Sequence, residues 1–331
     1  MLVLYILLTL VGTGIVWVGS DLLEGSSERL ATHYGLPPIV QGAVIAAIGS
    51  SFPEFSSTVL STAVHGEFEL GVGIITGSAI FNILVIPGIC GLVAKESLET
   101  NRDLVYKEAQ FYMLSVASLL LVFSFAVIYH PTEHLHGNVT RGLALFPLGL
   151  YCLYVFLQYM DTVEFEAEGA GAEDVWKEWG RLLLGMLLIL VGVEGLVRAA
   201  LAFGRIFNTP SFLWGVTVMA VATSIPDTFV SVKAARGGRA LPSLSNVLGS
   251  NIFDLLVCIP AGILIAGATA INFSVAAPLL GFLVIATVGL FVFTRTHLQV
   301  SRLESVLLIL FYGVFLAWMT LETMGITSYI Q

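Results

Sequence analysis

Apolar residues fill this chain in long runs that short polar segments separate. A helix needs about 20 mostly apolar residues to cross the hydrocarbon core of a membrane, because each residue adds about 1.5 Å. Ten runs are long and apolar enough. We therefore predict ten transmembrane helices, near residues 2–20, 37–64, 69–93, 106–129, 140–160, 180–203, 211–235, 241–268, 272–294 and 303–325.

The composition supports an all-α membrane protein. Hydrophobic residues make up 57% of the 331 residues and charged residues only 11%, whereas a soluble domain carries about 25% charged residues. The expected environment is therefore the lipid bilayer, with the chain crossing the cell membrane many times. The net charge of −9 argues against nucleic acid as a partner, since such partners need basic patches.

The basic residues predict the orientation in the membrane. If the N-terminus lies outside the cytoplasm, eleven of the 14 Lys and Arg residues fall in cytoplasmic connections. Cytoplasmic loops carry such an excess, so we expect both termini to be extracytoplasmic. The long polar segment 161–179, rich in Glu and Gly, would then be a cytoplasmic linker. Its acidic residues lack the spacing of an EF-hand calcium loop.

Two apolar runs are interrupted by a proline followed by an acid. They read Gly-Ser-Ser-Phe-Pro-Glu at 49–54 and Ala-Thr-Ser-Ile-Pro-Asp at 222–227. A carboxylate at membrane depth is costly and marks a functional site by default. The proline removes a backbone donor, which frees a carbonyl oxygen one turn earlier. We therefore predict a broken helix beside each acid.

The two interruptions belong to an internal repeat. Matched residues lie 173 positions apart in the first two helices of each half, and 172 apart for Gly-Ser-Ala-Ile-Phe-Asn (77–82) and Gly-Ser-Asn-Ile-Phe-Asp (249–254). Each half holds five predicted helices, an odd number, so the second half enters the membrane from the opposite side. We predict two inverted five-helix repeats, 1–160 and 180–331, joined by the linker 161–179. Transporters built this way bind their substrate at the repeat interface, near the midplane.

The polar residues that this symmetry brings together are oxygen donors, without His or Cys. We expect a site for a hard cation, since calcium takes about 6–8 oxygen ligands in flexible geometry, whereas magnesium tends to keep its waters. Sodium would share the same oxygens. The candidate ligands are Glu54, Asp227, Asp254, Asn82, Ser50, Ser51, Thr223, Ser224, Ser78 and Ser250.

A simpler interpretation exists for the hydroxyl residues, because Ser and Thr in membrane helices commonly bond to backbone or to neighbouring helices. Their repeat-matched positions beside the acids favour the ligand interpretation. We found no phosphate-binding glycine motif. We therefore expect neither a cofactor nor catalytic residues, and do not expect an enzyme.

These motifs resemble the two alpha-repeats of the calcium/cation antiporter superfamily, and within it the sodium/calcium exchanger family. The likeness rests on Gly-Ser-Ser-Phe-Pro-Glu (49–54), Ala-Thr-Ser-Ile-Pro-Asp (222–227) and Gly-Ser-Asn-Ile-Phe-Asp (249–254). It implies a secondary antiporter that exchanges sodium for calcium by alternating access, with the first and sixth helices sliding across the others.

The resemblance also assigns roles. Glu54 and Asp227 would be the central calcium ligands, assisted by the carbonyls of Ser50 and Thr223 and completed by Asn82 and Asp254. The hydroxyls of Ser51, Ser224, Ser78 and Ser250 would help to form sodium sites. We expect a single chain to be sufficient for function.

Several alternatives stay open at this stage. Asp at 227, where many prokaryotic members have Glu, is similar to the potassium-dependent exchangers, so potassium is a further candidate ion. Proton/calcium exchange ranks lower, because the Gly-Asn-Ala-Ala-Glu-His signature of that branch is absent. A cation channel would need a ring of acids from several chains. An intramembrane aspartyl protease would pair Glu54 with Asp227, but lacks a Gly-x-Gly-Asp element.

Overall fold

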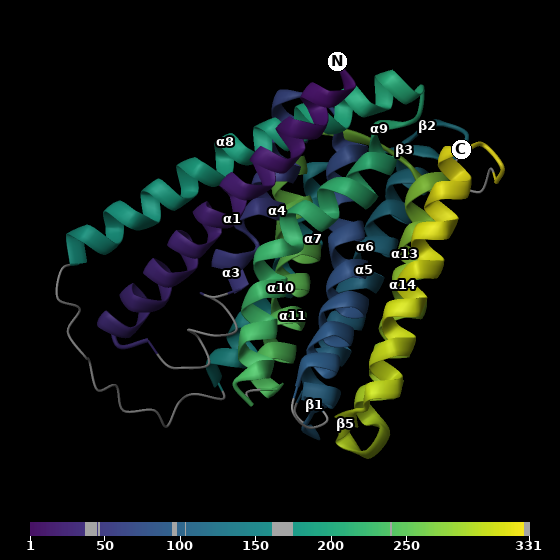
Figure 1. The fold of residues 1–331 in the computed structure, drawn as a ribbon. Coiled ribbons are helices and arrows are strands. Elements are labelled where there is room, and N and C mark those ends of the chain that lie inside the picture. Colours follow the sequence, from purple (N-terminus) through teal and green to yellow (C-terminus); the bar gives the residue numbers. More distant parts are fainter. Residues whose placement is uncertain are drawn as a thin grey trace.

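Long helices packed in a bundle make up most of the protein (Figure 1). The computed structural model describes residues 1–36, 45, 47–94, 98–102, 104–160, 175–238 and 240–327. Within these ranges, nine helical segments are long and apolar enough to cross a membrane. The predicted all-α membrane class is therefore confirmed.

The first half of the chain begins with one long helix and then breaks into short pieces. Its helices are α1 (Leu2–His33), α3 (Ala47–Ser50), α4 (Phe52–Val59), the π-helical η2 (Leu60–Val64), α5 (Phe68–Val93), the π-helical η3 (Leu104–Glu108), α6 (Ala109–Tyr129) and α7 (Arg141–Met160).

The second half has a similar order. Its helices are α8 (Val175–Phe207), α9 (Ser211–Trp214), the π-helical η4 (Gly215–Met219), α10 (Ala220–Arg236), α11 (Ala240–Phe253), the π-helical η5 (Asp254–Cys258), α12 (Ile259–Ala266), α13 (Phe273–Arg295), the 3₁₀-helical η6 (Thr296–Leu298) and α14 (Arg302–Thr323).

The second predicted span, 37–64, is described only in part, because residues 37–44 and 46 lie outside the described residues. Its described portion is broken between α3 and α4, and Pro53 lies in the first turn of α4. Proline is tolerated there because the first N–H groups of a helix have no intrahelical acceptor. The predicted break beside Glu54 is therefore observed.

The predicted break beside Asp227 is wrong, because α10 continues through Pro226 without interruption. The irregularity comes earlier, in η4, where the backbone pairs five residues apart. A missing N–H still leaves the carbonyl of Ala222, one turn before Pro226, without its helical donor. The helix tolerates this loss because its neighbours pack around it.

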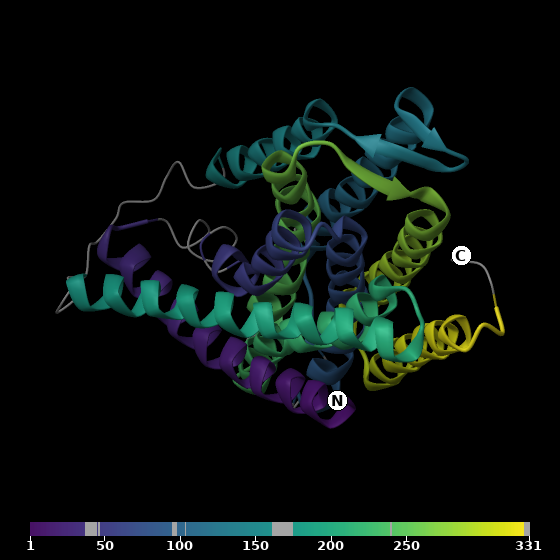
Figure 2. The ribbon, with the colours of Figure 1, turned by 90° about the horizontal axis from the view of Figure 1, so that it is seen from above.

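Helices α1 and α8 lie side by side along one side of the bundle (Figures 1 and 2). Glycines allow the close approach: a Cβ on Gly12 would lie 3.0 Å from the Gly192 carbonyl oxygen, and one on Gly19 would lie 2.9 Å from that of Gly185. Gly12 and Gly185 are 173 residues apart, as are Gly19 and Gly192. If each residue is replaced by its repeat mate, the contact between Gly12 and Gly192 becomes the contact between Gly185 and Gly19. This is expected for two antiparallel helices related by a two-fold axis.

Short strands, which the sequence analysis did not predict, join the two halves at opposite ends of the bundle (Figure 1). At one end β1 (Leu98–Glu99) pairs antiparallel with β5 (Gln299–Val300). At the other end lies the sheet of β2 (Pro131–Glu133), β3 (His136–Val139) and β4 (Thr269–Asn272), in the order β2-β3-β4. The start of α1 and the end of α14 lie at the β2-β3 end.

Helix α5 forms the centre of the bundle. Most of its side chains are buried, including Ile74, Ile80 and Ile83 with no exposed area. A helix that is apolar around its circumference is typical of such a position. Large apolar residues are exposed instead on α1, α7 and α14, for example Leu145 and Phe146, which fits outer faces in contact with lipid.

The sixth predicted span is longer than expected. It was predicted over 180–203 but α8 covers Val175–Phe207, so the last residues of the predicted linker are helical. Glu178 there forms ion pairs of 2.7 Å with both Arg29 on α1 and Arg181. Residues 161–174 of the linker lie outside the described residues.

Candidate functional site

The acid of the first half meets hydroxyls from both halves. Glu54 lies in the first turn of α4 and has no exposed area. Ser78 of α5 donates a hydrogen bond to Glu54 Oε1 at 3.2 Å, and its Oγ lies 2.7 Å from that of Ser224 on α10. Thr223 also faces this carboxylate. Polar side chains from both halves of the chain therefore meet at Glu54.

The acid of the second half meets an amide from the first. Asn82 of α5 donates a hydrogen bond to Asp227 Oδ2 at 3.3 Å. The hydroxyls of Ser50, at the end of α3, and of Ser250 on α11 face the same carboxylate. Asp227 is 1% exposed and the three neighbours are equally buried. Each carboxylate is thus held by polar groups from both halves of the chain.

The third acid, Asp254, is the first residue of η5 and is fully buried. Cys258, one turn later, donates a weak hydrogen bond to Asp254 Oδ1, with 3.6 Å between the sulfur and oxygen atoms. Ser51 faces this carboxyl group, which also lies within the electrostatic range of Glu54 and Asp227. All three acids therefore occupy one buried region.

Some hydroxyls of the predicted set bond to backbone. Thr223 donates to the Met219 carbonyl at 3.1 Å and Ser250 to the Val247 carbonyl at 3.2 Å, while Ser51 donates to the Ser250 carbonyl at 3.4 Å. These are the bonds expected of ordinary membrane-helix hydroxyls. A hydroxyl that donates its proton still has lone pairs to offer a cation, so the contacts are compatible with ligation.

Two further residues extend the site and were missed by the sequence analysis. Asn251 accepts a hydrogen bond from Asn82 at 3.1 Å and donates to the Ala79 carbonyl at 3.2 Å. Tyr112 of α6 lies at the far side of Asn251, 3.5 Å from its amide nitrogen. The one available signal was that Asn251 belongs to the Gly-Ser-Asn-Ile-Phe-Asp motif.

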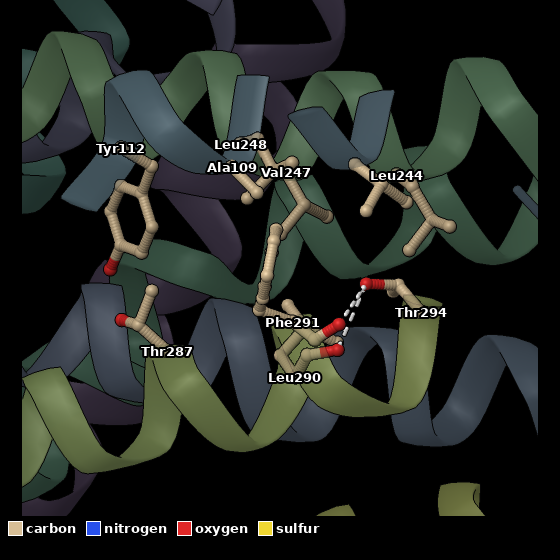
Figure 3. Close-up of a pocket in the computed structure, with 10 residues that line it drawn as sticks. Ala109, Tyr112, Leu244, Val247, Leu248, Thr287, Leu290, Phe291 and Thr294 are labelled. Carbon is tan, nitrogen blue, oxygen red and sulfur yellow. Dashed lines mark hydrogen bonds between the residues drawn. The ribbon is translucent and has the colours of Figure 1, made fainter. Parts of the chain in front are cut away.

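Tyr112 also marks where the polar region ends. Figure 3 shows it with Thr287 at one end of a pocket whose other walls are mainly aliphatic, among them Leu244, Val247 and Leu290. The pocket holds about 10 Å³, which is at the lower limit for one water molecule. The side of the site beyond Tyr112 is therefore lined mainly by apolar side chains.

Within the part of the chain that the structure describes, four buried oxygen atoms at the site have no hydrogen-bond donor. They are Glu54 Oε2, Asp227 Oδ1, Asp254 Oδ2 and Asn82 Oδ1. A buried polar atom without a partner costs about 1–3 kcal/mol, and a charged one costs more. A cation would supply the missing partner for each of these oxygens, and all four are hard ligands of the kind that calcium and sodium prefer.

The acids alone do not form a closed metal cage. Among the described residues, no group of three or more His, Cys, Asp or Glu side chains is close enough to hold a metal ion. Any bound cation must therefore also use amide, hydroxyl or carbonyl oxygens, or water.

The fold and the buried oxygens define an α-helical membrane protein with a central, buried cluster of carboxylate, amide and hydroxyl groups. The family described as sodium/calcium exchanger protein matches residues 4–160 and 177–321. The chain belongs to this family, and the predicted resemblance is confirmed.

Individual relatives agree with this assignment. The sodium/calcium exchanger MaX1 of Methanosarcina acetivorans is 25% identical over 96% of this chain and 98% of its own. Among solved structures, that of the sodium-calcium exchanger NCX_Mj has a TM-score of 0.67 at 24% identity, over 96% of this chain and 99% of its own. The H⁺/Ca²⁺ exchanger CAX has a TM-score of 0.72 at 18% identity, over 98% and 85%. At these identities the structures support the fold alone.

Proposed function

We propose that this protein is a secondary antiporter that exchanges sodium for calcium across the cell membrane. The observation that carries the proposal is the set of unpartnered oxygens on Glu54, Asp227, Asp254 and Asn82, buried together at the meeting point of the two halves. Carboxylates from both halves provide the negative charge that a divalent cation requires. The membership of the sodium/calcium exchanger family supports the same conclusion.

Calcium would bind between Glu54 and Asp227. Each carboxylate has one oxygen held by a protein donor, Ser78 or Asn82, and one oxygen without a donor. The donor fixes the orientation of the carboxylate, and the other oxygen is available to the ion. Carbonyls near the two prolines and the surrounding hydroxyls would bring the ligand number toward the 6–8 that calcium takes.

Sodium would use overlapping oxygens. The hydroxyls of Ser51, Ser78 and Ser250 lie beside the carboxylates, and that of Ser224 lies beside Ser78. All four are neutral, which suits a monovalent ion. Removal of calcium leaves carboxylates whose mutual repulsion is costly in a low-dielectric site, and several sodium ions would relieve it. Because both ions need the same carboxylates, they compete, and competition at one site is what couples the two movements.

Alternating access would come from the α1–α8 pair. The two helices contact each other through glycines at symmetric positions, and they lie along one side of the bundle (Figure 2). In an inverted repeat, rocking or sliding of such elements opens the site to one side and then to the other. We further propose that residues 1–160 and 180–331 act as the two repeats, with both termini extracytoplasmic and the linker 161–179 cytoplasmic.

A second candidate is potassium-dependent exchange. Asp227 has a side chain one methylene shorter than Glu, and this leaves more space between the carboxylates for a larger ion. The other candidate ligands would be the same as for sodium/calcium exchange. This candidate differs from the first in the ions required and not in the site.

Transport assays in liposomes test the proposal. Purified protein in liposomes loaded with sodium should take up calcium when sodium is diluted outside, with no uptake when the internal sodium is replaced by choline. Adding or omitting potassium, and imposing a pH gradient, separates the potassium-dependent and proton-coupled alternatives. Absence of calcium uptake under all sodium, potassium and proton gradients would disprove the proposed function.

A further inference from the structure

Glu24 of α1 is an acidic side chain that the proposed site does not include. It is half-buried, whereas its acidic neighbours Asp21 and Glu28 are exposed. Helix α1 packs here against α3: a Cβ on Gly49 would lie 3.7 Å from the Glu24 Cα atom and 3.2 Å from Ser27 Oγ. Gly49 immediately precedes Ser50, whose hydroxyl faces Asp227. The backbone at Glu24 therefore lies directly beside the site.

The same face of α1 contacts α10. The rings of Trp17 and Phe229 stack with their centroids 4.7 Å apart, and Phe229 is two residues beyond Asp227. Seven residues after Trp17, the Glu24 carboxylate lies within the electrostatic range of both Asp227 and Lys233 of α10. Both helices run away from the N-terminal end of the bundle (Figure 1). Glu24 is therefore farther along this direction than Asp227, toward what the proposed topology makes the cytoplasmic end.

Ser20 adds a second polar group on this face. It is 1% exposed, and its Oγ has no hydrogen-bond partner among the residues that the structure describes. It precedes Glu24 by four residues, so the two side chains lie one above the other on the helix. Ser20 and Glu24 therefore offer a buried hydroxyl oxygen and a half-buried carboxylate, one turn apart on the same face of α1.

The repeat-matched face of α8 has no such groups. At an offset of 173 residues, Ser20 corresponds to Val193 and Glu24 to Val197. Both valines have no exposed area. The two halves therefore differ at these positions, and the position on α8 that matches Glu24 has no carboxylate.

We propose that Glu24, with Ser20, binds the transported cation on its way between the Asp227 carboxylate and the cytoplasmic side. The inference rests on the proposed function. A divalent cation between Glu24 and Asp227 would be attracted to both carboxylates and reduce the repulsion between them. Because the matched position on α8 is Val197, the effect of Glu24 is confined to one side of the membrane.

The test compares the two sides of the membrane. Everted vesicles expose the cytoplasmic side, and right-side-out vesicles expose the outer side. Glu24→Gln should weaken the apparent calcium affinity about tenfold in everted vesicles, the loss expected when one charge interaction of about 1.4 kcal/mol is removed. In right-side-out vesicles the affinity should stay within about twofold of the wild type. Glu28→Gln, the same chemical change one turn away at an exposed position, should have no effect on either side.

The outcomes separate the inference from the proposed function. If the wild type transports no calcium in either vesicle type, the proposed function fails. If the wild type transports calcium but Glu24→Gln matches it, shifts both sides equally, or is matched by Glu28→Gln, the inference is wrong. Should Glu24→Gln fail to insert, Glu24→Asp keeps the charge and shortens its reach. An unchanged cytoplasmic affinity in Glu24→Asp would then overturn the inference.

Discussion

The side-chain amide of Asn82 donates a hydrogen bond to Asp227 across the two halves of the chain, over 3.3 Å. In the repeat, Asn82 corresponds to Asp254, and Asp227 corresponds to Glu54. The symmetric counterpart of this contact is thus Asp254 beside Glu54, and the two carboxyl groups lie within electrostatic range. One half supplies a neutral donor where the other supplies an acid, so the site is symmetric in shape and asymmetric in charge.

Glu54→Gln and Asp227→Asn should each abolish calcium transport while the protein remains folded and inserted. Loss of a residue that only orients a metal ligand lowers metal affinity by about 10–100-fold, and loss of a ligand should exceed that. Calcium uptake into sodium-loaded liposomes measures the effect. Glu133→Gln, at an exposed position on β2, is the control and should transport normally. Normal uptake by either site variant would remove that residue from the site.

The same two variants should separate stability from binding. An amide of nearly equal size removes a buried charge and its desolvation cost. Without calcium, the variants should therefore unfold at the same temperature as the wild type or at a higher one. The measurement is thermal unfolding in detergent, with calcium buffered by a chelator. A variant that unfolds at a much lower temperature would indicate a structural role for the carboxylate.

Calcium should stabilise the wild type against heat. A ligand that binds only the folded state adds about 2.7 kcal/mol at 100 times its dissociation constant. The Tm should rise with calcium concentration and fall when a chelator is added, and sodium should reduce the calcium effect by competition. The shift should be lost in Glu54→Gln. A calcium-induced shift of full size in that variant would place the stabilising ion elsewhere.

The acids of the site were predictable, because a carboxylate within an apolar run has few explanations other than function. Asn251 and Tyr112 were not, since an amide or a phenol is common in membrane helices, and only the tertiary contacts reveal that they continue the network from Asn82. The sequence also could not distinguish the two prolines. Pro53 starts a helix and Pro226 lies inside one, because the outcome depends on how the neighbouring helices pack.

The ends of helices and strands could not be predicted from the sequence either. Helix α8 begins at Val175, within a segment whose sequence predicts a polar linker, and Glu178 there forms an ion pair with Arg29 of α1, a helix far away in the sequence. The pairing of β1 with β5 joins residues about 200 positions apart, and each strand has only two residues. Strands of two residues are too short to show a periodic pattern of apolar and polar residues. They form only because the two connecting segments that contain them lie next to each other in the fold.

Gly19→Ala should destabilise the α1–α8 contact and slow transport. A Cβ at Gly19 would lie 2.8 Å from Ile189 Cγ1 and 2.9 Å from the Gly185 carbonyl, so the helices must separate, which typically costs about 1–3 kcal/mol. Gly14→Ala is the matched control, because nothing lies within 4 Å of its Cβ. There, alanine should be neutral or stabilising by about 0.5–1 kcal/mol. Thermal unfolding and calcium uptake rates measure both variants, and equal behaviour would contradict a close α1–α8 contact.

The linker should be accessible from the cytoplasm and not from outside. A variant without Cys90, Cys152 and Cys258, carrying Glu168→Cys instead, places a single thiol in the segment 161–179. A membrane-impermeant maleimide should label it in everted vesicles and fail to label it in right-side-out vesicles, because the excess of Lys and Arg predicts that this side of the chain faces the cytoplasm. Thr132→Cys in β2, at the end of the bundle opposite the β1–β5 pair, should show the opposite pattern (Figure 1). Labelling of the linker from outside would show that the orientation in the membrane is the opposite of the predicted one. The side of the membrane assigned to Glu24 would then change as well.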